Sequence, residues 1–240
     1  MSQAAIGRTL GPHSFTTQDG ETVALAKFRG KPTLINLVFT SCYHTCPAIT
    51  QRLKRAVEAA RAALGNDTFT VLTIGFDTAA DTPERMRLYA HEQGIDMASW
   101  SFLSADQATV DALTGDLGFI YFPSARGFDH LAQITVVDGQ GQVYRQIYGP
   151  DFATPAIVEP LRELALGVTY RRSGVGNLIE RVRLFCTVYD PRSGRYRFDN
   201  SIFVAALSGI LSLGAVAVFL IRQLRRADGS AQKGSPPPVN

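Results

Sequence analysis

Cysteine is scarce in this chain, and its scarcity excludes one broad class of protein. Three cysteines occur among 240 residues, namely Cys42, Cys46 and Cys186. That number is too small for a secreted scaffold held together by disulfides. An excess of one charge is missing as well, because 24 Lys and Arg nearly balance 21 Asp and Glu, for a formal net charge of +3. The basic residues are scattered, so we expect no nucleic-acid partner.

Long apolar runs are absent from most of the chain, with one exception near the C-terminus. Residues 201–222 contain the uncharged run IFVAALSGILSLGAVAVFLI. A helix of about 20 such residues can span a bilayer, whereas a core helix usually keeps a polar face, so we predict one transmembrane helix. Arginines flank the run on both sides, and the start of the chain (MSQAAIGRTLG) has no apolar core of a signal peptide. The sequence therefore leaves two alternatives open, a removed leader or a cytosolic domain anchored by its tail.

Upstream of that run, strand-like and helix-like segments alternate. Thr33 to Phe39 (TLINLVF) and Phe69 to Phe76 (FTVLTIGF) have the composition of strands covered on both faces. Other patterns predict four helices, over Pro47–Leu64, from Thr82 as its cap to about Gln93, from Ser104 to Gly115 or Gly118, and over Thr154–Leu166. They also predict a hairpin of strands Leu131–Asp138 and Gln142–Tyr148. This order predicts an α/β fold. We divide the chain into a lead-in (1–20), the α/β domain (21–167), a basic, aromatic connector (168–200), the transmembrane helix (201–222) and a disordered polar tail (223–240).

Two cysteines lie where the first buried strand gives way to a helix. Cys42 and Cys46 stand in TSCYHTCP, and Pro47 suits the first turn of the helix. Ligands gather at the carboxyl ends of strands in α/β sheets, and a helix N-terminus favours thiolate. A spacing of four residues places both sulfurs on one side of a helical turn. Two thiolates so placed suit copper better than magnesium or calcium, and they can also close into a disulfide.

A copper site with two thiolates stays open, and the four histidines are the candidates for a third donor. His91 falls on the polar side of a helix, which is typical of a solvated surface residue, and His13 lies unconstrained in the lead-in. His44 stands between the cysteines, so its ring can point away from both. His130, in GFDH, precedes a strand whose start can approach the cysteine loop. From the residues alone, a ligand and a hydrogen-bonded structural histidine are nearly equal alternatives for His130.

Three segments together resemble a known family. TLINLVFTSCYHTCP has a CxxxCP motif after a buried strand, GFDTAADTPERMRLY has an Asp followed by Asp-Thr-Pro, and FDHLAQITVVDGQGQV has Asp-His before a strand. Over roughly residues 10–166, the order and content of these segments resemble the SenC/Sco proteins, copper-handling assembly factors for cytochrome c oxidase. The matching residues are Cys42, Cys46, Pro47, Asp77, Asp81, Thr82, Pro83 and His130.

The resemblance implies a thioredoxin-like fold and a copper metallochaperone. One copper ion, Cu(I) or Cu(II), would be bound by Cys42, Cys46 and His130 and delivered to the binuclear copper site of an oxidase subunit. Asp77 matches a family position near the copper, where it can orient a ligand. The resemblance also implies a single-pass protein of the bacterial inner membrane with its domain in the periplasm, or the intermembrane-space side in mitochondria. The family's usual anchor precedes the domain, whereas the apolar run follows it here.

Other functions of the same cysteines stay open. In a thiol–disulfide oxidoreductase, Cys42 or Cys46 would be catalytic and attack a partner disulfide, for example to reduce the oxidase cysteines before metallation. That chemistry does not require His130, so enzymatic activity is undecided. A peroxide-reducing enzyme needs a cation beside its cysteine, and TSCYHTCP contains no arginine, so we rank it last. Cys186 either takes part in transfer or is a structural thiol.

Overall fold

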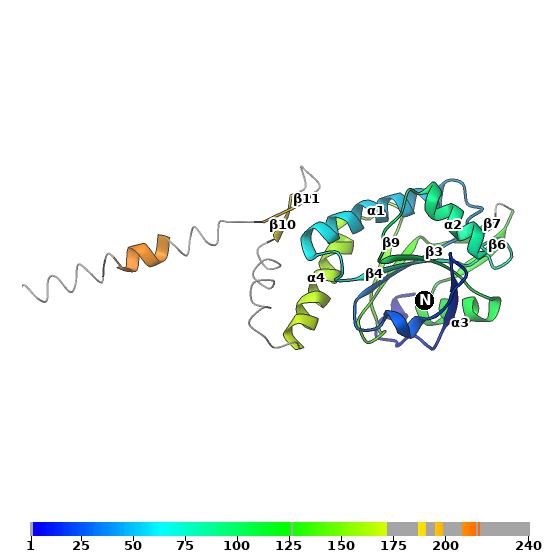
Figure 1. Cartoon of the computed structure of the whole chain (residues 1–240), viewed down its shortest axis with the longest axis horizontal. Helices are drawn as coiled ribbons and strands as arrows, with labels where there is room; N and C mark the ends of the chain where they lie inside the picture. The colour runs from blue at the N-terminus through cyan, green and yellow to red at the C-terminus, as the bar shows by residue number, and fades with distance from the viewer. Residues whose placement is uncertain are drawn as a thin grey trace, which may run out of the picture. The chain divides into compact units, whose positions relative to one another are not determined.

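A computed structural model of the chain describes residues 2–125, 127–171, 187–190, 195–198, 208–214 and 216 (Figure 1). The chain divides into two compact units, Met1–Arg197 and Phe198–Asn240. Within the described residues, no helix is both long and apolar enough to cross a membrane. Most of the predicted span 201–222 lies outside the described residues, as does Cys186.

A seven-stranded mixed sheet forms the centre of the first unit, in the order β2-β1-β5-β4-β3-β8-β9. Its strands are β1 (Ser14–Thr17), β2 (Thr22–Ala24), β3 (Thr33–Val38), β4 (Thr70–Gly75), β5 (Trp100–Ser104), β8 (Gln133–Val137) and β9 (Val143–Tyr148). β3, β4 and β5 run parallel, and the remaining neighbours pair antiparallel. Every side chain of β3 is buried, as its continuous apolar run predicts. Two predicted strands, TLINLVF and FTVLTIGF, thus become the adjacent central strands β3 and β4.

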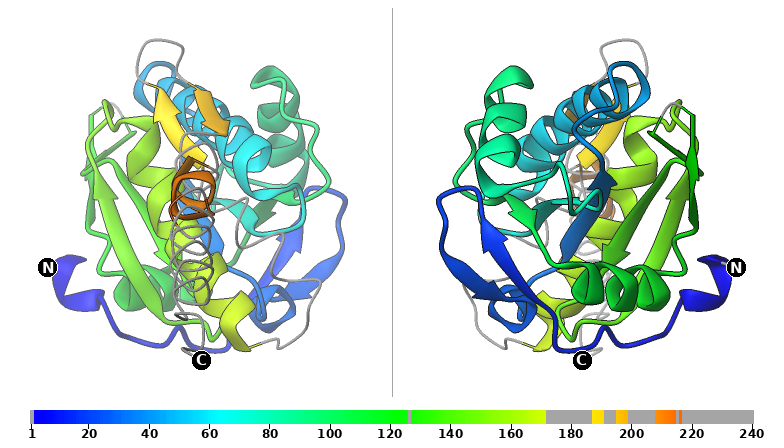
Figure 2. Two further views of the ribbon diagram at one scale, coloured as in Figure 1. Left: turned by 90° about the vertical axis from the view of Figure 1, so that its left-hand side faces the viewer. Right: turned by 90° about the vertical axis from the view of Figure 1, so that its right-hand side faces the viewer.

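Helices cover both faces of this sheet. They are α1 (Thr45–Leu64), α2 (Pro83–Glu92), α3 (Gln107–Leu117) and α4 (Thr154–Arg171), with short 3-10 helices η1 (Ser2–Ala5) and η2 (Leu25–Phe28). The parallel crossovers from β3 to β4 and from β4 to β5 place α1 and α2 on the same face, where α4 packs against α1. α3 lies on the opposite face (Figures 1 and 2). The α/β class that the sequence predicts is therefore confirmed.

Capping residues define where α2 and α3 begin. The hydroxyl of Thr82 accepts the N–H of Arg85 at 3.3 Å, which confirms the predicted cap of α2. Asp106 caps α3 in the same way, and Gly118 ends it with a φ of +62°. α1 begins at Thr45 rather than at Pro47, so Cys46 belongs to its first turn.

Several strands were not predicted. β1 lies within the segment that we expected to be a lead-in, and it pairs with both β2 and β5. Its sequence, SFTT, has only one large apolar residue, which is a weak strand signal. β5 (WSFLS) has two serines that interrupt its apolar run, yet pairing between β4 and β1 buries it. Such strands form because their neighbours supply the ladder, which no local pattern reveals.

Two small hairpins complete the described elements. β6 (Tyr121–Ser124) and β7 (Gly127–His130) pair antiparallel, with Tyr121 opposite His130. β10 (Thr187–Asp190) and β11 (Arg195–Phe198) form a second two-stranded sheet. GFDH is thus a strand of its own, separate from the predicted strand that becomes β8. His130 ends β7 and lies close in sequence to the start of β8.

Candidate metal centre

The two cysteines lie in the loop from β3 into α1. The backbone N–H of Cys42 donates to the carbonyl of Phe39 at 3.1 Å, which turns the chain directly after the strand. The N–H of Cys46 donates to Sγ of Cys42 at 3.4 Å. The sulfur of Cys42 therefore faces the first turn of α1, which contains Cys46, as the i, i+4 spacing predicts. Both thiols are free in this structure.

The two thiols have different environments. Burial alone would raise the pKa of Cys42, but N–H donors from Cys46, His44 and Thr45 outweigh it and lower that pKa below its ordinary value. Cys46 is only 2% exposed, and this burial raises its pKa well above the ordinary range. Cys42 is thus the more accessible and more acidic thiol, whereas Cys46 keeps its proton until something replaces it.

His130 reaches the same region from the β6–β7 hairpin. Its half-buried ring packs edge-on against Phe76, with ring centres 5.5 Å apart, and against Phe39, at 5.9 Å. Phe119 lies at 5.3 Å, and Nδ1 lies 3.2 Å from the carbonyl oxygen of Leu131. Burial lowers the pKa of His130, although the Leu131 carbonyl and Asp129 oppose it. The imidazole is therefore held neutral near pH 7, which is the form that binds metals.

Cys46 and His130 line one narrow cavity, which has no room for a water molecule. Asn36 from β3 and Gln133 from β8 complete its polar wall. The described residues contain no group of three or more His, Cys, Asp or Glu side chains placed to hold a metal ion. The fold thus brings Cys42 next to Cys46 and His130 to the cavity beside Cys46, but it does not assemble a finished three-donor site.

The other histidines lie elsewhere. His91 is exposed on α2 and His44 is exposed at the start of α1. His13 differs from our expectation, because it is 7% exposed and its Nε2 lies 2.8 Å from Oδ2 of Asp116 on α3. The lead-in residue that the sequence left unconstrained is therefore anchored to the domain.

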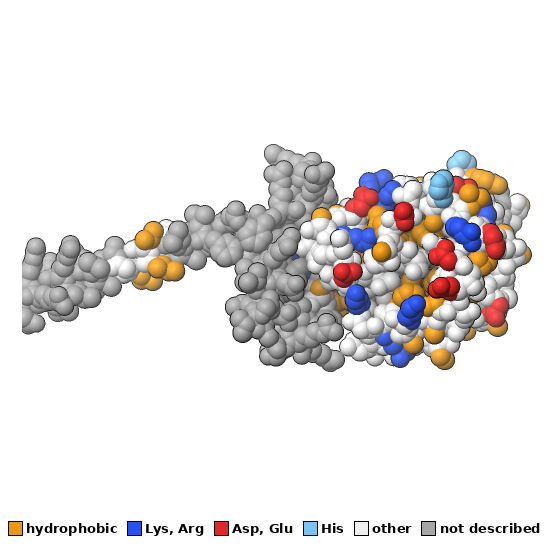
Figure 3. Space-filling model, in the orientation of Figure 1, with side chains coloured by type: hydrophobic (Ala, Val, Ile, Leu, Met, Phe, Trp, Pro, Cys, Tyr) orange, Lys and Arg blue, Asp and Glu red, His pale blue; other side chains and the backbone are white. Residues whose placement is uncertain are grey.

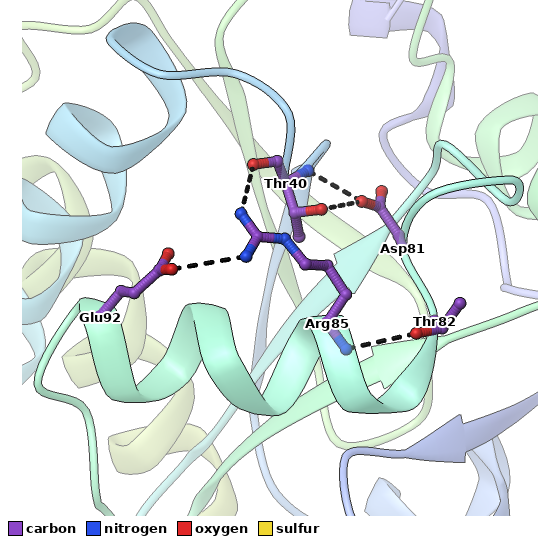
Figure 4. Close-up of polar contacts among 5 residues, drawn as sticks. All are labelled: Thr40, Asp81, Thr82, Arg85 and Glu92. Atoms are coloured by element: carbon purple, nitrogen blue, oxygen red, sulfur yellow. Dashed lines mark hydrogen bonds and ion pairs between the residues drawn. The ribbon is translucent and has the colours of Figure 1, made fainter.

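A buried carboxylate supports the cysteine loop, and it belongs to Asp81 rather than to Asp77. Oδ1 of Asp81 accepts the N–H of Thr40 at 2.8 Å and its hydroxyl at 2.6 Å, as Figure 4 shows. Oδ2 accepts the backbone N–H of Asp77 at 2.9 Å. In the described part of the chain, the hydrogen bonds of Asp77 are made by its backbone. The sequence places Asp81 in a motif but gives it no role, because its partner Thr40 lies in the loop after β3, 41 residues away.

An arginine also reaches this loop, although none occurs in TSCYHTCP. Arg85, in the first turn of α2, donates from Nη2 to the carbonyl of Thr40 at 3.3 Å and pairs with Glu92 at 3.4 Å (Figure 4). Only the packing of α2 beside the end of β3 brings it there. The local sequence of the loop could not have revealed it.

The chain is similar to known proteins in both sequence and fold. The sequence pattern of the SCO1/SenC family matches residues 2–166. The SCO1 protein homolog of Bacillus subtilis (strain 168) is 26% identical over 93 residues, which are 39% of this chain and 47% of that relative. The chain thus spans about half the length of the curated relative that it matches.

Two solved structures share the fold. ScoI of Bradyrhizobium japonicum, solved with copper bound, is 24% identical with a TM-score of 0.54, covering 66% of this chain and 99% of ScoI. BsSco, a member of the Sco family of cytochrome c oxidase assembly proteins in which a disulfide switch was identified, is 20% identical with a TM-score of 0.60, covering 67% and 95%. These likenesses confirm a thioredoxin-like domain. Together with the match over most of that domain, they lead to one conclusion: the chain belongs to the SCO1/SenC family.

Proposed function

We propose that this protein is a copper metallochaperone, which holds one copper ion between Cys42, Cys46 and His130. The observation that carries the proposal is the thiol pair at the start of α1, with His130 lining the same cavity as Cys46. Family membership and the copper bound to the related ScoI support it. We further propose that the ion is delivered to the binuclear copper site of a cytochrome c oxidase subunit, since BsSco belongs to a family of oxidase assembly proteins.

The donor types fit copper. Two thiolates and a neutral imidazole suit copper better than hard cations, which prefer oxygen. A site of three protein donors leaves room for an incoming ligand, so copper can pass to a partner by exchange. Because the three donors are not assembled in this structure, binding of copper would bring the His130 imidazole and the two sulfurs closer together. Cys42 offers the first contact for the ion, and Cys46 then loses its proton.

Replacing His130 by Ala tests the ligand set. We expect His130→Ala to weaken copper binding by more than about 100-fold, because loss of a ligand should exceed the 10–100-fold cost of losing an outer partner. The measurement is titration of the fully reduced protein with copper under a competing chelator, where the wild type should bind one equivalent. His91→Ala, an exposed histidine outside the site, is the matched control. Full affinity in His130→Ala would remove that residue from the site.

Copper affinity should also depend on pH, with a sign set by Cys46. Its raised pKa means that the metal-free protein carries this proton near neutral pH, so binding must release it. His130 has a lowered pKa and releases little. We expect log affinity to rise by about one for each pH unit between about pH 6.5 and 8, and by more if Cys42 is also protonated. Competition titrations across that range, together with proton release in weak buffer, measure the slope. A flat profile would contradict the thiol assignment.

A second function has one observation in its favour, the inequality of the two thiols. An accessible, more acidic Cys42 in front of a buried Cys46 suits attack on a partner disulfide followed by internal resolution. In that reaction the Cys42 thiolate forms a mixed disulfide, and Cys46 then releases the reduced partner. This oxidoreductase does not need the imidazole. His130→Ala should therefore retain disulfide exchange with a glutathione-oxidised model peptide, even where copper affinity is lost.

The location of the protein is a separate proposal. We infer that residues 201–222 anchor it in the bacterial inner membrane, with the thioredoxin-like domain in the periplasm where copper is exchanged. The uncharged run of residues 202–221 supports the anchor. Protease treatment of spheroplasts, with detection of residues 21–167, tests the side. Protection of the domain would place it in the cytoplasm.

A further inference from the structure

Asp81 is an unusual residue for the interior of this domain. It is 2% exposed, between β4 and the cap of α2, and no cation pairs with it among the described residues. Burying a carboxylate without a counter-ion is unfavourable unless hydrogen bonds compensate. Three do so here, two from Thr40 and one from the backbone of Asp77. Because burying this carboxylate is unfavourable, its place in the fold calls for an explanation.

The hydrogen bonds from the Asp81 carboxylate to the cysteine loop all go to one residue at the start of that loop. Thr40, 3% exposed, follows β3 and stands two positions before Cys42. Its N–H and hydroxyl are held by Asp81, and its carbonyl is held by Arg85 (Figure 4). Every polar group of Thr40 is thus fixed from the β4–α2 connection. The loop that carries the thiols therefore starts from a point with little freedom.

The packing behind Asp81 shows that the arrangement is tight. A Cβ added to Gly75, the last residue of β4, would lie 2.4 Å from Cβ of Asp81 and 2.9 Å from its Cγ. Such contacts do not occur between real atoms, so only glycine at this position admits the carboxylate. The absence of a side chain at residue 75 therefore provides the space that the Asp81 side chain occupies.

We infer that Asp81, with Arg85, is a positioning residue for the Cys42–Cys46 pair, acting through Thr40. The inference deepens the proposed function and rests on it for its copper-dependent part. Among the described residues, Asp81 makes no hydrogen bond to either thiol; it holds Thr40, at the start of the loop that carries them. Holding the loop in its reduced geometry keeps the sulfurs available as two separate donors. Loosening it should make closure into a disulfide easier, because less ordered structure must be distorted.

Asp81→Asn and Asp96→Asn form a matched pair for the first test. Asn at residue 81 loses the charge and puts an amide N–H₂ on one side of a site where three donors need an acceptor. Asp96→Asn makes the same chemical change at an exposed position outside the site. The copper-free readout is the equilibrium dithiol + GSSG ⇌ disulfide + 2 GSH for Cys42 and Cys46. We expect Asp81→Asn to shift it about 10-fold toward disulfide, the effect of one to two hydrogen bonds, and Asp96→Asn less than about 2-fold.

Copper provides the second readout. With Cu(II), the thiolate-to-copper charge-transfer band reports the geometry of the sulfurs, which a loss of overall stability alone does not move. We expect Asp81→Asn to shift that band and to weaken affinity by about 10-fold or more, with Asp96→Asn unchanged. If the wild type binds no copper, the proposed function fails, and the glutathione equilibrium still decides the role of Asp81. If folded Asp81→Asn leaves that equilibrium unchanged, or Asp96→Asn shifts it equally, the positioning role is wrong.

A second pair of variants applies where Asp81→Asn does not fold. Arg85 has a partly exposed side chain, and Arg85→Gln removes its hydrogen bond to the Thr40 carbonyl. Arg87 lies on the same helix as Arg85, and Arg87→Gln removes a similar bond to the carbonyl of Gln18. We expect a shift of the glutathione equilibrium toward disulfide by about 2–5-fold in Arg85→Gln and none in Arg87→Gln. Equal behaviour of the two variants would overturn the inference.

Discussion

Replacing Cys46 by Ser is expected to abolish tight copper binding, with a loss of more than about 100-fold in affinity. Cys46 is the buried thiol of the proposed site, and a serine hydroxyl there stays protonated and binds copper poorly. The loss should exceed the 10–100-fold seen for residues that only support a ligand. Copper titration with a competing chelator measures it. In contrast to loss of His130, loss of Cys46 should also prevent an internal disulfide, because Cys42 then has no partner in the loop.

Ser41→Ala is the matched control for this variant. It lies in the same loop, is exposed, and stands beside Cys42. We expect its copper stoichiometry and affinity to stay within about 2-fold of the wild type, since exposed substitutions have small effects. One equivalent of tightly bound copper in Cys46→Ser would exclude the thiol pair as the site and would point to donors elsewhere in the chain.

Replacing Phe76 by Ala should cause the largest loss of stability, about 3–5 kcal/mol in the free energy of unfolding. Phe76 is 1% exposed, and its ring contacts Phe39, Phe119, Tyr121, Phe128 and His130 with ring centres 4.9–5.5 Å apart. Its removal leaves a cavity at the centre of this aromatic cluster. Urea unfolding followed by circular dichroism measures the loss. A cost below about 1 kcal/mol would show that the cluster does not pack as described.

A milder pair of variants separates stability from the position of His130. Phe76→Leu and Phe69→Leu each replace a buried ring with an aliphatic side chain. Phe69 directly precedes β4, and Phe76 directly follows it. We expect similar losses of stability, of about 1–2 kcal/mol. Only Phe76 contacts His130, so only Phe76→Leu should change the NMR chemical shifts of that imidazole. Identical imidazole shifts in both variants would contradict the contact.

The parts of the fold that local sequence determines were predicted well. TLINLVF and FTVLTIGF became β3 and β4 because a buried parallel strand needs an uninterrupted apolar run. Thr82 was predicted as a cap and acts as one. WSFLS was missed because β5 is a strand through its pairing with β4 and β1, and the serines hide that from any pattern in the segment itself.

For the site, sequence predicted the paired thiols but not what supports them. The spacing of Cys42 and Cys46 alone indicates sulfurs on one side of a turn, and the structure shows the N–H of one directed at the sulfur of the other. The contact of Asp81 with Thr40 depends on how the β4–α2 connection packs on β3, over a separation of 41 residues. A motif match marks such an acid but does not say which group it holds. The role of Asp77 in orienting a copper ligand stays a prediction.

The pairing of β8 with β3 has a consequence for how the chain is made. Asn36 on β3 lies opposite Ile134 on β8, so the cysteines follow one strand and His130 precedes the other. A ribosome synthesises both thiols long before it reaches the imidazole. During that interval a nascent chain carries Cys42 and Cys46 but not yet His130. In the proposed site, all three donors can then be present only in chains that have completed their central sheet, so retention of copper would distinguish mature molecules from unfinished ones.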